Sequence, residues 1–416
     1  MQTHLSGFIQ NTAAGQEAES ILRQCVHCGF CLATCPTYNL LGDELDSPRG
    51  RIYLIKQMLE GAPVSEKTQL HLDRCLSCRA CETSCPSGVQ YGRLLDIGRE
   101  VVKQRVGRKS AAALKRWILH KVLLQRRLFA LLLSSARLLK NILPDTLARK
   151  IPSRRLARPW PAVRHPRRML ILDGCVQPAL APDINVSAAH VLDALGISLI
   201  LTAQAKCCGA ISHHLDYQQN GLVLARQNID AWWPYIEQGI EAIVVTASGC
   251  GTMVADYAHL LRHDVVYAEK ARAISALFRD ISQVIGAEKE TLGKRLKEQK
   301  NVMRDKIAFH SPCSLQHGLK ITGVVEKILL DAGYELVSVS DSHLCCGSAG
   351  TYSLLQLELS QRLLANKVEA LTANRPSRIV TANIGCLTHI ESGLSQNGGP
   401  PIQHWIELIA NDLAVH

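Results

Sequence analysis

Eight of the sixteen cysteines form two runs that share one spacing. Each run reads Cys-x2-Cys-x2-Cys-x3-Cys-Pro, and the members are Cys25, Cys28, Cys31 and Cys35, followed by Cys75, Cys78, Cys81 and Cys85. Cysteines three residues apart let one tight loop supply three corners of an iron-sulfur cube. Zinc usually takes two separated cysteine pairs and needs only four ligands. The doubled run therefore predicts two 4Fe-4S clusters.

The fourth cysteine of each run is followed by proline, at Pro36 and Pro86, and begins a departing segment. The runs resemble those of bacterial two-cluster ferredoxins, in which this cysteine ligates the other cluster. A crossed assignment follows: one cluster held by Cys25, Cys28, Cys31 and Cys85, and a second held by Cys75, Cys78, Cys81 and Cys35. A fully ligated cube has no open position for substrate but can change its charge by one electron. The expected chemistry is electron transfer.

The other eight cysteines lie in an internal repeat. Cys175, Cys207, Cys208 and Cys250 have as counterparts Cys313, Cys345, Cys346 and Cys386. Each copy reads as a strand ending at a cysteine, a helix, Cys-Cys-Gly, a second helix and a strand ending in Gly-Cys. Alternating strands and helices predict a parallel sheet, with sites at the carboxyl ends of the strands. We expect the modules to face their cysteines into one site or two pseudo-equivalent sites.

The Cys-Cys-Gly pattern resembles the cysteine-rich domain of heterodisulfide reductase and of iron-sulfur subunits of flavin-linked dehydrogenases. In fuller versions of that motif the last cysteine is half of a Cys-x2-Cys pair, whereas here Ala247 and Asn383 occupy the partner positions. This departure disfavours a heterodisulfide-cleaving cluster. Three roles stay open for the eight cysteines: one or two further iron-sulfur sites, a redox disulfide between vicinal cysteines, or a vestigial site that only packs.

The helices and strands expected around these cysteines indicate an α/β multidomain protein. Residues 1–98 form a helical two-cluster ferredoxin domain, in which Pro48 begins a helix and Gly61 ends it. Residues 99–166 form a basic helical segment that ends in a proline-rich, extended linker. Residues 167–300 and 301–416 form the two tandem α/β cysteine-rich modules.

Composition narrows the class of protein. The chain has 416 residues, 47% of them hydrophobic and 20% charged, so it can bury several cores. Its start, MQTHLSGFIQNTAAGQ, lacks the layout of a secretory signal, which favours a reducing, cytoplasmic compartment. No apolar stretch approaches the roughly 20 residues that span a bilayer.

The formal charge of +11 arises mostly between Arg99 and Arg168, where only Glu100 and Asp145 are acidic. Within this stretch, residues 123–143 alternate leucine clusters with arginine and lysine, a pattern typical of a basic amphipathic helix on an anionic membrane. Such a helix would place the protein peripherally on the cytoplasmic face of the inner membrane. A helix packed on its own domain or on a partner, with its basic residues solvated, explains the pattern equally well.

Over nearly all of its length the chain resembles the iron-sulfur subunits of bacterial glycolate oxidase, also called glycolate dehydrogenase. The resemblance rests on HCGFCLATCPTY, LGDELDSPRGRIYLIKQ, HLDRCLSCRACETSCPSGV, NIDAWWP, TASGCG, HLCCGSAGTY, TANIGC and HWIE. It implies a three-part complex in which FAD-bearing partner subunits oxidise glycolate to glyoxylate. This chain would then pass the electrons to a quinone or another acceptor and would not act on substrate alone.

The sequence agrees with FAD being held by partner subunits only. Gly249-x-Gly251 follows a strand, but Val254 stands at the third glycine position of a dinucleotide loop. A hydride leaves as two electrons and clusters take them singly, so a flavin must stand between. Two alternatives remain: the same role with lactate or glycerol 3-phosphate as donor, and a heterodisulfide-reductase-like thiol enzyme. We expect no nucleic-acid partner.

Overall fold

The computed structural model describes residues 1–140, 142, 151–298 and 305–413. The chain divides into two compact units. The first, here called the N-terminal unit, comprises residues 1–117 and 343–364, and the second, the module unit, comprises residues 118–342 and 365–416. Part of the second cysteine-rich repeat, including its Cys-Cys-Gly, therefore belongs to the N-terminal unit. The domain boundaries given above stay predictions.

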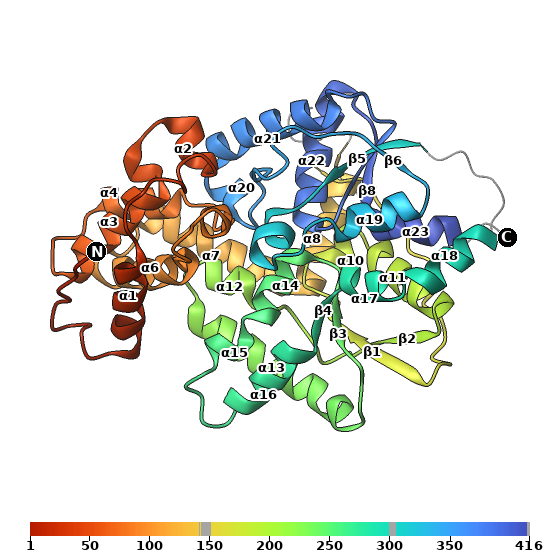
Figure 1. Ribbon diagram of the computed structural model, residues 1–416, viewed down its shortest axis with the longest axis horizontal. Helices are drawn as coiled ribbons and strands as arrows, with labels where there is room; N and C mark the ends of the chain where they lie inside the picture. Colours follow the sequence, from red (N-terminus) through yellow and green to blue (C-terminus); the bar gives the residue numbers. More distant parts are fainter. Residues whose placement is uncertain (141, 143–150, 299–304, 414–416) are drawn as a thin grey trace. The chain divides into compact units, whose positions relative to one another are not determined.

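The N-terminal unit is built from short helices and loops; in Figure 1 its residues 1–117 are coloured red to orange and its residues 343–364 blue. Its helices are α1 (Ala13–Gln24), α2 (Pro36–Leu41), α3 (Pro48–Leu59), α4 (Glu66–Asp73), α5 (Ala80–Thr83), α6 (Tyr91–Val106), the first part of α7 (Ser110–Leu124), α20 (Tyr352–Leu355) and the first part of α21 (Leu357–Thr372). The predicted helix at Pro48 is confirmed as α3, which Ser47 caps by accepting a hydrogen bond from the Gly50 N–H.

Helices α3 and α6 form the centre of the N-terminal core. Ile52 and Ile55 of α3 are buried against Leu94 and Leu95 of α6. The helices approach closely at Gly98, where an added Cβ would lie 2.8 Å from Cγ1 of Ile55. This rigid pair supports the loops that carry both cysteine runs.

The module unit contains two four-stranded parallel sheets of identical topology (Figure 1). The first has β1 (Arg167–Ile171), β2 (Ile197–Leu201), β3 (Ile243–Val245) and β4 (Phe278–Asp280) in the order β2-β1-β3-β4. The second has β5 (Lys306–His310), β6 (Glu335–Leu336), β7 (Arg378–Thr381) and β8 (Ile402–His404) in the order β6-β5-β7-β8. The predicted α/β fold class and the internal repeat are confirmed.

Helices cover these sheets and join them through one core. They are α10 (Gln177–Leu180), α11 (Asp183–Ala194), α12 (Ala210–His214), α13 (Gln218–Glu237), α14 (Ser248–Ala255), α15 (Tyr257–Leu260), α16 (Ala268–Leu277), α17 (Ile281–Ala287), α18 (Lys289–Glu298), a π-helical turn (Ser314–Gly318), α19 (Val324–Asp331), α22 (Ile384–Asn397) and α23 (Trp405–Leu413). Ile184 and Ala188 of α11 share a buried cluster with Trp405 and Ile409 of α23.

The basic segment is helical, as predicted, but one prediction within it is wrong. A single helix over residues 123–143 does not form, because α7 ends at Leu124 and α8 (Arg126–Leu138) starts after an extended Gln125. The break has a tertiary cause: Leu124 packs on the core of the first module, and Arg126 pairs with Asp173. Among the described residues, no helix is long and apolar enough to cross a membrane.

The described part of the proline-rich linker, residues 151–166, has almost no regular secondary structure and is fastened along the first module. The Trp160 indole N–H donates to the Leu199 carbonyl at 3.1 Å. Arg158 pairs with Asp183 at 3.1 Å. Pro144 lies outside the described residues.

Candidate iron-sulfur site

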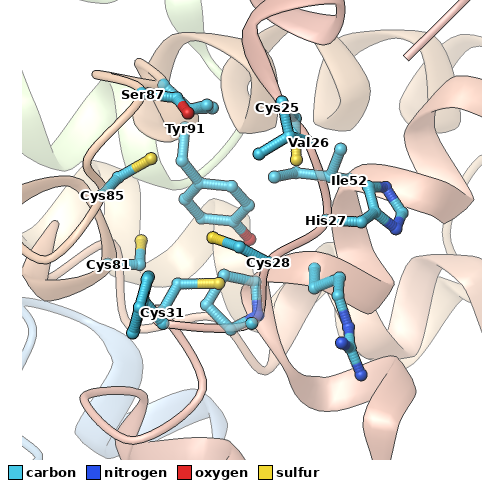
Figure 2. A pocket seen from close by; sticks show the side chains of 15 residues that line it. Cys25, Val26, His27, Cys28, Cys31, Ile52, Cys81, Cys85, Ser87 and Tyr91 are labelled. Atoms are coloured by element: carbon cyan, nitrogen blue, oxygen red, sulfur yellow. The ribbon is translucent and has the colours of Figure 1, made fainter.

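The loop between α1 and α2 and the segment after α5 bring four cysteines around one cavity (Figure 2). Its lining includes Cys25, Cys28, Cys31 and Cys85, here called the first cysteine ring, together with Cys81. Burial, and next the nearby Cys25 sulfur, raises the pKa of Cys31 to about 11. Burial also raises the pKa of Cys25, with Cys85 and Cys28 adding to the effect. The structure thus places Cys85 with the first run, as crossed ligation requires.

A second cavity is lined by Cys35, Cys75, Cys78 and Cys81, here called the second cysteine ring. Cys35 precedes α2 and Cys75 follows α4. The pKa of Cys81 lies well above its ordinary value because of burial and then the neighbouring sulfurs of Cys78 and Cys75. Cys35, the fourth cysteine of the first run, therefore lies with the second.

The two loops share an unusual backbone conformation at matching positions. His27 and Ser77, the second residue after the first cysteine of each run, have φ values of 58° and 53°. Gly29 and Arg79, the residue after the second cysteine, have φ values of 86° and 60°. Left-handed residues cost roughly 1–2 kcal/mol outside glycine. The repeated left-handed residues show that the two loops follow the same backbone path past their first two cysteines.

Iron-sulfur clusters fit both rings. Each brings four sulfurs together in a partly enclosed cavity. Burial and repulsion between sulfurs oppose the thiolate form of Cys25, Cys31 and Cys81. Metal ions reverse that balance because they stabilise thiolates directly. All sixteen cysteines are free thiols in the structure.

A buried ion-pair network adjoins the second ring. Arg51 is 1% exposed, donates to the His71 carbonyl at 2.7 Å, and pairs with Asp46 at 3.2 Å. Its Nη1 lies 4.0 Å from Sγ of Cys35. Arg74 pairs with the other carboxylate oxygen of Asp46 at 2.8 Å. Burial alone would lower the pKa of Arg51, but the negative groups around it, led by Cys75, outweigh burial and keep it charged.

Sequence reasoning did not single out two buried residues beside the cysteine rings, Arg51 and Tyr91. Tyr91 opens α6, is 4% exposed, and lines both cavities; Figure 2 shows its ring among the sulfurs. Burial, then the charge of Cys75, raises the pKa of Tyr91. The only available signal was position: Arg51 lies on the helix between the runs, and Tyr91 shortly follows the second run.

In the first module, all four cysteines meet at the carboxyl ends of β1 and β3. The thiol of Cys207 lies within reach of the thiols of Cys175 and Cys208, and Cys208 lies within reach of Cys250 as well. Donation by Cys175 and Cys208 lowers the pKa of Cys207 well below its ordinary value. The same bonds, with burial, raise the pKa of Cys175 and Cys208.

The glycine of Cys-Cys-Gly has the same role in both repeats. Gly209 has φ +98°, and a Cβ there would lie 2.8 Å from the Gly221 carbonyl oxygen of α13. Gly347 has φ +88°, and a Cβ there would lie 2.7 Å from the Ser360 carbonyl oxygen of α21. In each copy the cysteine pair is therefore held directly against the following helix.

In the second module, Cys313 and Cys386 belong to the module unit, whereas Cys345 and Cys346 belong to the N-terminal unit. Convergence of these four cysteines stays a prediction. Within the module unit, Asn383 donates to Sγ of Cys386 at 3.6 Å and accepts from the Gly249 N–H at 3.2 Å. Ala247 is buried in the shared core. The two positions that carry cysteine in fuller motifs therefore have packing and bridging roles here.

Comparison with known proteins agrees with this geometry. The 4Fe-4S dicluster domain matches residues 21–89, and the cysteine-rich domain matches residues 169–255 and 307–391. The glycolate oxidase iron-sulfur subunit of Escherichia coli (strain K12) is 51% identical over 415 residues, which cover 99% of both chains. This chain belongs to the family of glycolate oxidase iron-sulfur subunits.

Other members and distant relatives show how far the likeness extends. A probable glycolate oxidase iron-sulfur subunit of Bacillus subtilis (strain 168) is 30% identical over 94% of this chain and 93% of its own. Lactate utilization protein A of an Exiguobacterium strain is 24% identical over 56% of this chain and 94% of its own. As a glycolate oxidase iron-sulfur subunit homologue, the protein is an iron-sulfur protein with an electron-transfer role.

Proposed function

We propose that this chain is the electron-transfer subunit of a glycolate dehydrogenase complex. FAD-bearing partner subunits oxidise glycolate to glyoxylate, and this chain conducts the electrons to a quinone or another acceptor. The observation that carries the proposal is the pair of crossed cysteine rings, which meet at Cys81 and Tyr91 inside one compact unit. The names of the family members supply the donor substrate.

The ligand assignment follows the two cavities. Cys25, Cys28, Cys31 and Cys85 bind one 4Fe-4S cluster, and Cys75, Cys78, Cys81 and Cys35 bind the second. Bound clusters supply one-electron reduction and oxidation. The chain supplies enclosure, through buried residues such as Ile52 and Tyr91, and charge, through Arg51. It supplies no open coordination position at which glycolate could react.

The first module supports a third cluster. Its four sulfurs form one continuous chain of contacts, and the backbone N–H groups of Gly209 and Ala210 lie 3.5 Å from the sulfurs of Cys207 and Cys208. Donors aimed at sulfur favour thiolates and tune cluster potential. We expect this cluster to be bound by Cys175, Cys207, Cys208 and Cys250. The cysteines of the second module are proposed as a further redox or cluster site.

The surroundings of the Gly-x-Gly segment disfavour flavin binding by this chain. Gly249 and Gly251 lie in the first turn of α14. The Gly249 N–H already donates to Asn383, and a Cβ at Gly251 would lie 3.0 Å from the Phe278 ring. A pyrophosphate needs free N–H groups and open space at such a turn. FAD is therefore assigned to partner subunits only.

The experiment that tests the function uses the co-purified complex under anaerobic conditions. Adding glycolate should reduce the flavin and then the clusters of this chain, as followed by electron paramagnetic resonance. The isolated chain should leave glycolate unchanged. Reduction by lactate or glycerol 3-phosphate, with no response to glycolate, would assign the same relay to another donor. Oxidation of glycolate by the isolated chain would contradict the proposal.

The exposed face of α8 supports a peripheral position on the cytoplasmic side of an anionic membrane. Leu131 and Leu138 are 66% and 83% exposed, and Arg127 is exposed beside them. Arg126 and Arg137 are less available, because they bond to Asp173 and to the Pro152 and Ser153 carbonyls. This part of the proposal rests on two interactions. The exposed leucines would contact lipid, and the chain's net charge of +11 would be attracted to the anionic surface.

A further inference from the structure

The two cysteine-rich modules share one topology, but their strands end in different side chains. His310, the last residue of β5, lies three residues before the first cysteine of its repeat, where the first module has Leu172. Thr381, the last residue of β7, lies five residues before the last cysteine of its repeat, where the first module has Val245. The strand register pairs His310 with Thr381. Two apolar positions of the first module are therefore polar, and adjacent, in the second.

All four of these side chains are buried, and the polar pair lacks partners. Leu172 and Val245 pack in the hydrophobic core of the first module. His310 is 2% exposed and Thr381 is fully buried. Within the described part of the chain, Nε2 of His310 and Oγ1 of Thr381 have no hydrogen-bond partner. A buried polar atom without a partner costs about 1–3 kcal/mol, so a histidine in this place indicates a further bonding role.

Cys386 lies beside this histidine. A ring nitrogen of His310 and Sγ of Cys386 lie within 4.8 Å of each other, and both side chains are buried. In a tetrahedral metal site, metal–nitrogen and metal–sulfur bonds of about 2.0–2.1 Å and 2.3 Å place the two ligand atoms about 3.6 Å apart. A small side-chain adjustment brings the pair to that spacing. Both side chains can therefore bind one metal ion.

The surroundings of Cys386 favour the thiolate that a metal needs. Cys386 lies in the first turn of α22, where the positive end of the helix dipole stabilises negative charge. The Asn383 side chain donates to its Sγ at 3.6 Å. Imidazole and thiolate ligands suit zinc and iron, whereas magnesium and calcium prefer oxygen ligands.

The loop after β5 supplies a further sulfur at the same edge of the sheet. Cys313 immediately precedes the π-helical turn. Gln316 of that turn donates to the Ser311 carbonyl at 2.9 Å and to the Ser342 carbonyl at 3.1 Å. These bonds fix the loop that carries Cys313. The convergence predicted from the repeat makes Cys313 the third expected ligand.

We propose that the second module holds a single metal ion, zinc or iron, and that His310 and Cys386 are ligands, with Cys313 as a third. The inference refines the further site proposed above for the second module and rests on that proposal. On binding, the ion replaces the thiol protons of the cysteines, while the imidazole binds in its neutral form. The first module has no such nitrogen ligand at this strand end, because Leu172 stands there.

The test measures zinc and iron together in the anaerobically purified full chain. About one ion per chain is expected in addition to the iron of the clusters. His310→Ala should lower the occupancy of this ion about tenfold or more and leave the signals of both cysteine rings intact. His310→Cys should retain the ion, because a thiolate can replace the imidazole.

His404→Gln is the matched control. His404 is also a buried histidine, on the neighbouring strand β8, but it already bonds to the Thr246 carbonyl and the Ile406 N–H. This variant should keep the ion. Loss of the ion from His404→Gln as well as from His310→Ala, with no rescue by His310→Cys, would show a general effect on folding and overturn the ligand assignment.

Spectroscopy identifies the nitrogen ligand directly. If the ion is zinc, X-ray absorption should show nitrogen at about 2.0–2.1 Å and sulfur at about 2.3 Å, and His310→Cys should replace nitrogen by sulfur. If the ion is iron, labelling histidine with nitrogen-15 should change the nitrogen coupling in its paramagnetic resonance. Iron would keep a redox role for the site, whereas zinc would keep the ligands and remove that role.

Two results overturn the inference: a chain with no ion beyond the clusters, or an ion bound by sulfur alone that His310→Ala retains. A chain without iron in the two cysteine rings would instead contradict the proposed function. The two failures are therefore distinguishable.

Discussion

The side-chain oxygen of Asn383 accepts a hydrogen bond from the backbone N–H of Gly249 at 3.2 Å, which ties the second cysteine-rich module to the first. The same side chain donates to Cys386 at 3.6 Å. A position that holds cysteine in fuller motifs therefore bridges the modules here. Nearby, Ser248 and Ser314 add a hydroxyl contact of 2.7 Å between the repeats.

Asn383→Ala should destabilise the module unit. The change leaves the Gly249 N–H without its partner, which costs about 1–3 kcal/mol when the group is buried. Chemical denaturation would measure the loss. Asn220→Ala, at an exposed position of α13, is the matched control and should change the free energy of unfolding little. Equal effects of the two variants would contradict the bridging role.

Crossed ligation predicts which cysteine variants resemble each other. Cys85→Ser should alter the same paramagnetic signal as Cys28→Ser, although Cys85 belongs to the second run. Cys35→Ser should likewise alter the same signal as Cys78→Ser. If Cys85→Ser instead shared its signal with Cys78→Ser, each run would bind its own cluster and the crossed assignment would be wrong.

Acid should weaken the contact between the modules through His404. This buried imidazole lies 3.0 Å from the Thr246 carbonyl and accepts from the Ile406 N–H at 3.2 Å. Burial lowers the pKa of His404 to about 4. The unfolded chain, with a histidine pKa near 6.5, binds the proton more readily, so stability is retained above about pH 6.5 and lost as the pH falls towards 4.

A pKa shift of this size corresponds to a loss of about 3 kcal/mol in the free energy of unfolding between pH 6.5 and pH 4. Denaturation at pH 7 and pH 5 would measure the part of this loss, about 2 kcal/mol, that falls between those two pH values. His404→Gln should flatten the pH dependence, while His263→Gln, at an exposed position, should retain it. An unchanged slope in His404→Gln would show that other groups cause the acid sensitivity.

Membrane binding through α8 predicts loss of flotation with anionic vesicles when Leu131 and Leu138 are changed together to Gln. Both side chains are exposed, so the fold should tolerate the change. Val265→Gln, at a fully exposed position in the loop between α15 and α16, is the control and should float like the parent protein. Unchanged flotation of the double variant would exclude this face as the contact.

The sequence predicts those parts of the protein that depend on local spacing. Cysteines three residues apart let one loop wrap a compact centre. The doubled strand-helix pattern predicts two parallel sheets, and the structure contains both. The break at Gln125 was not predictable, because it depends on where Leu124 packs and on the Arg126–Asp173 pair. Arg51 and Tyr91 were missed for the same reason: long-range packing brings them to the sulfurs.

Iron content, with paramagnetic resonance of the anaerobically purified full chain, tests the central claim most directly. Clusters in both rings require about eight irons per chain, and the first module should raise this to about twelve. Cys207→Ser should return the count to about eight and leave both ring signals intact. Four irons or fewer, or zinc in place of iron, would contradict the two-cluster relay.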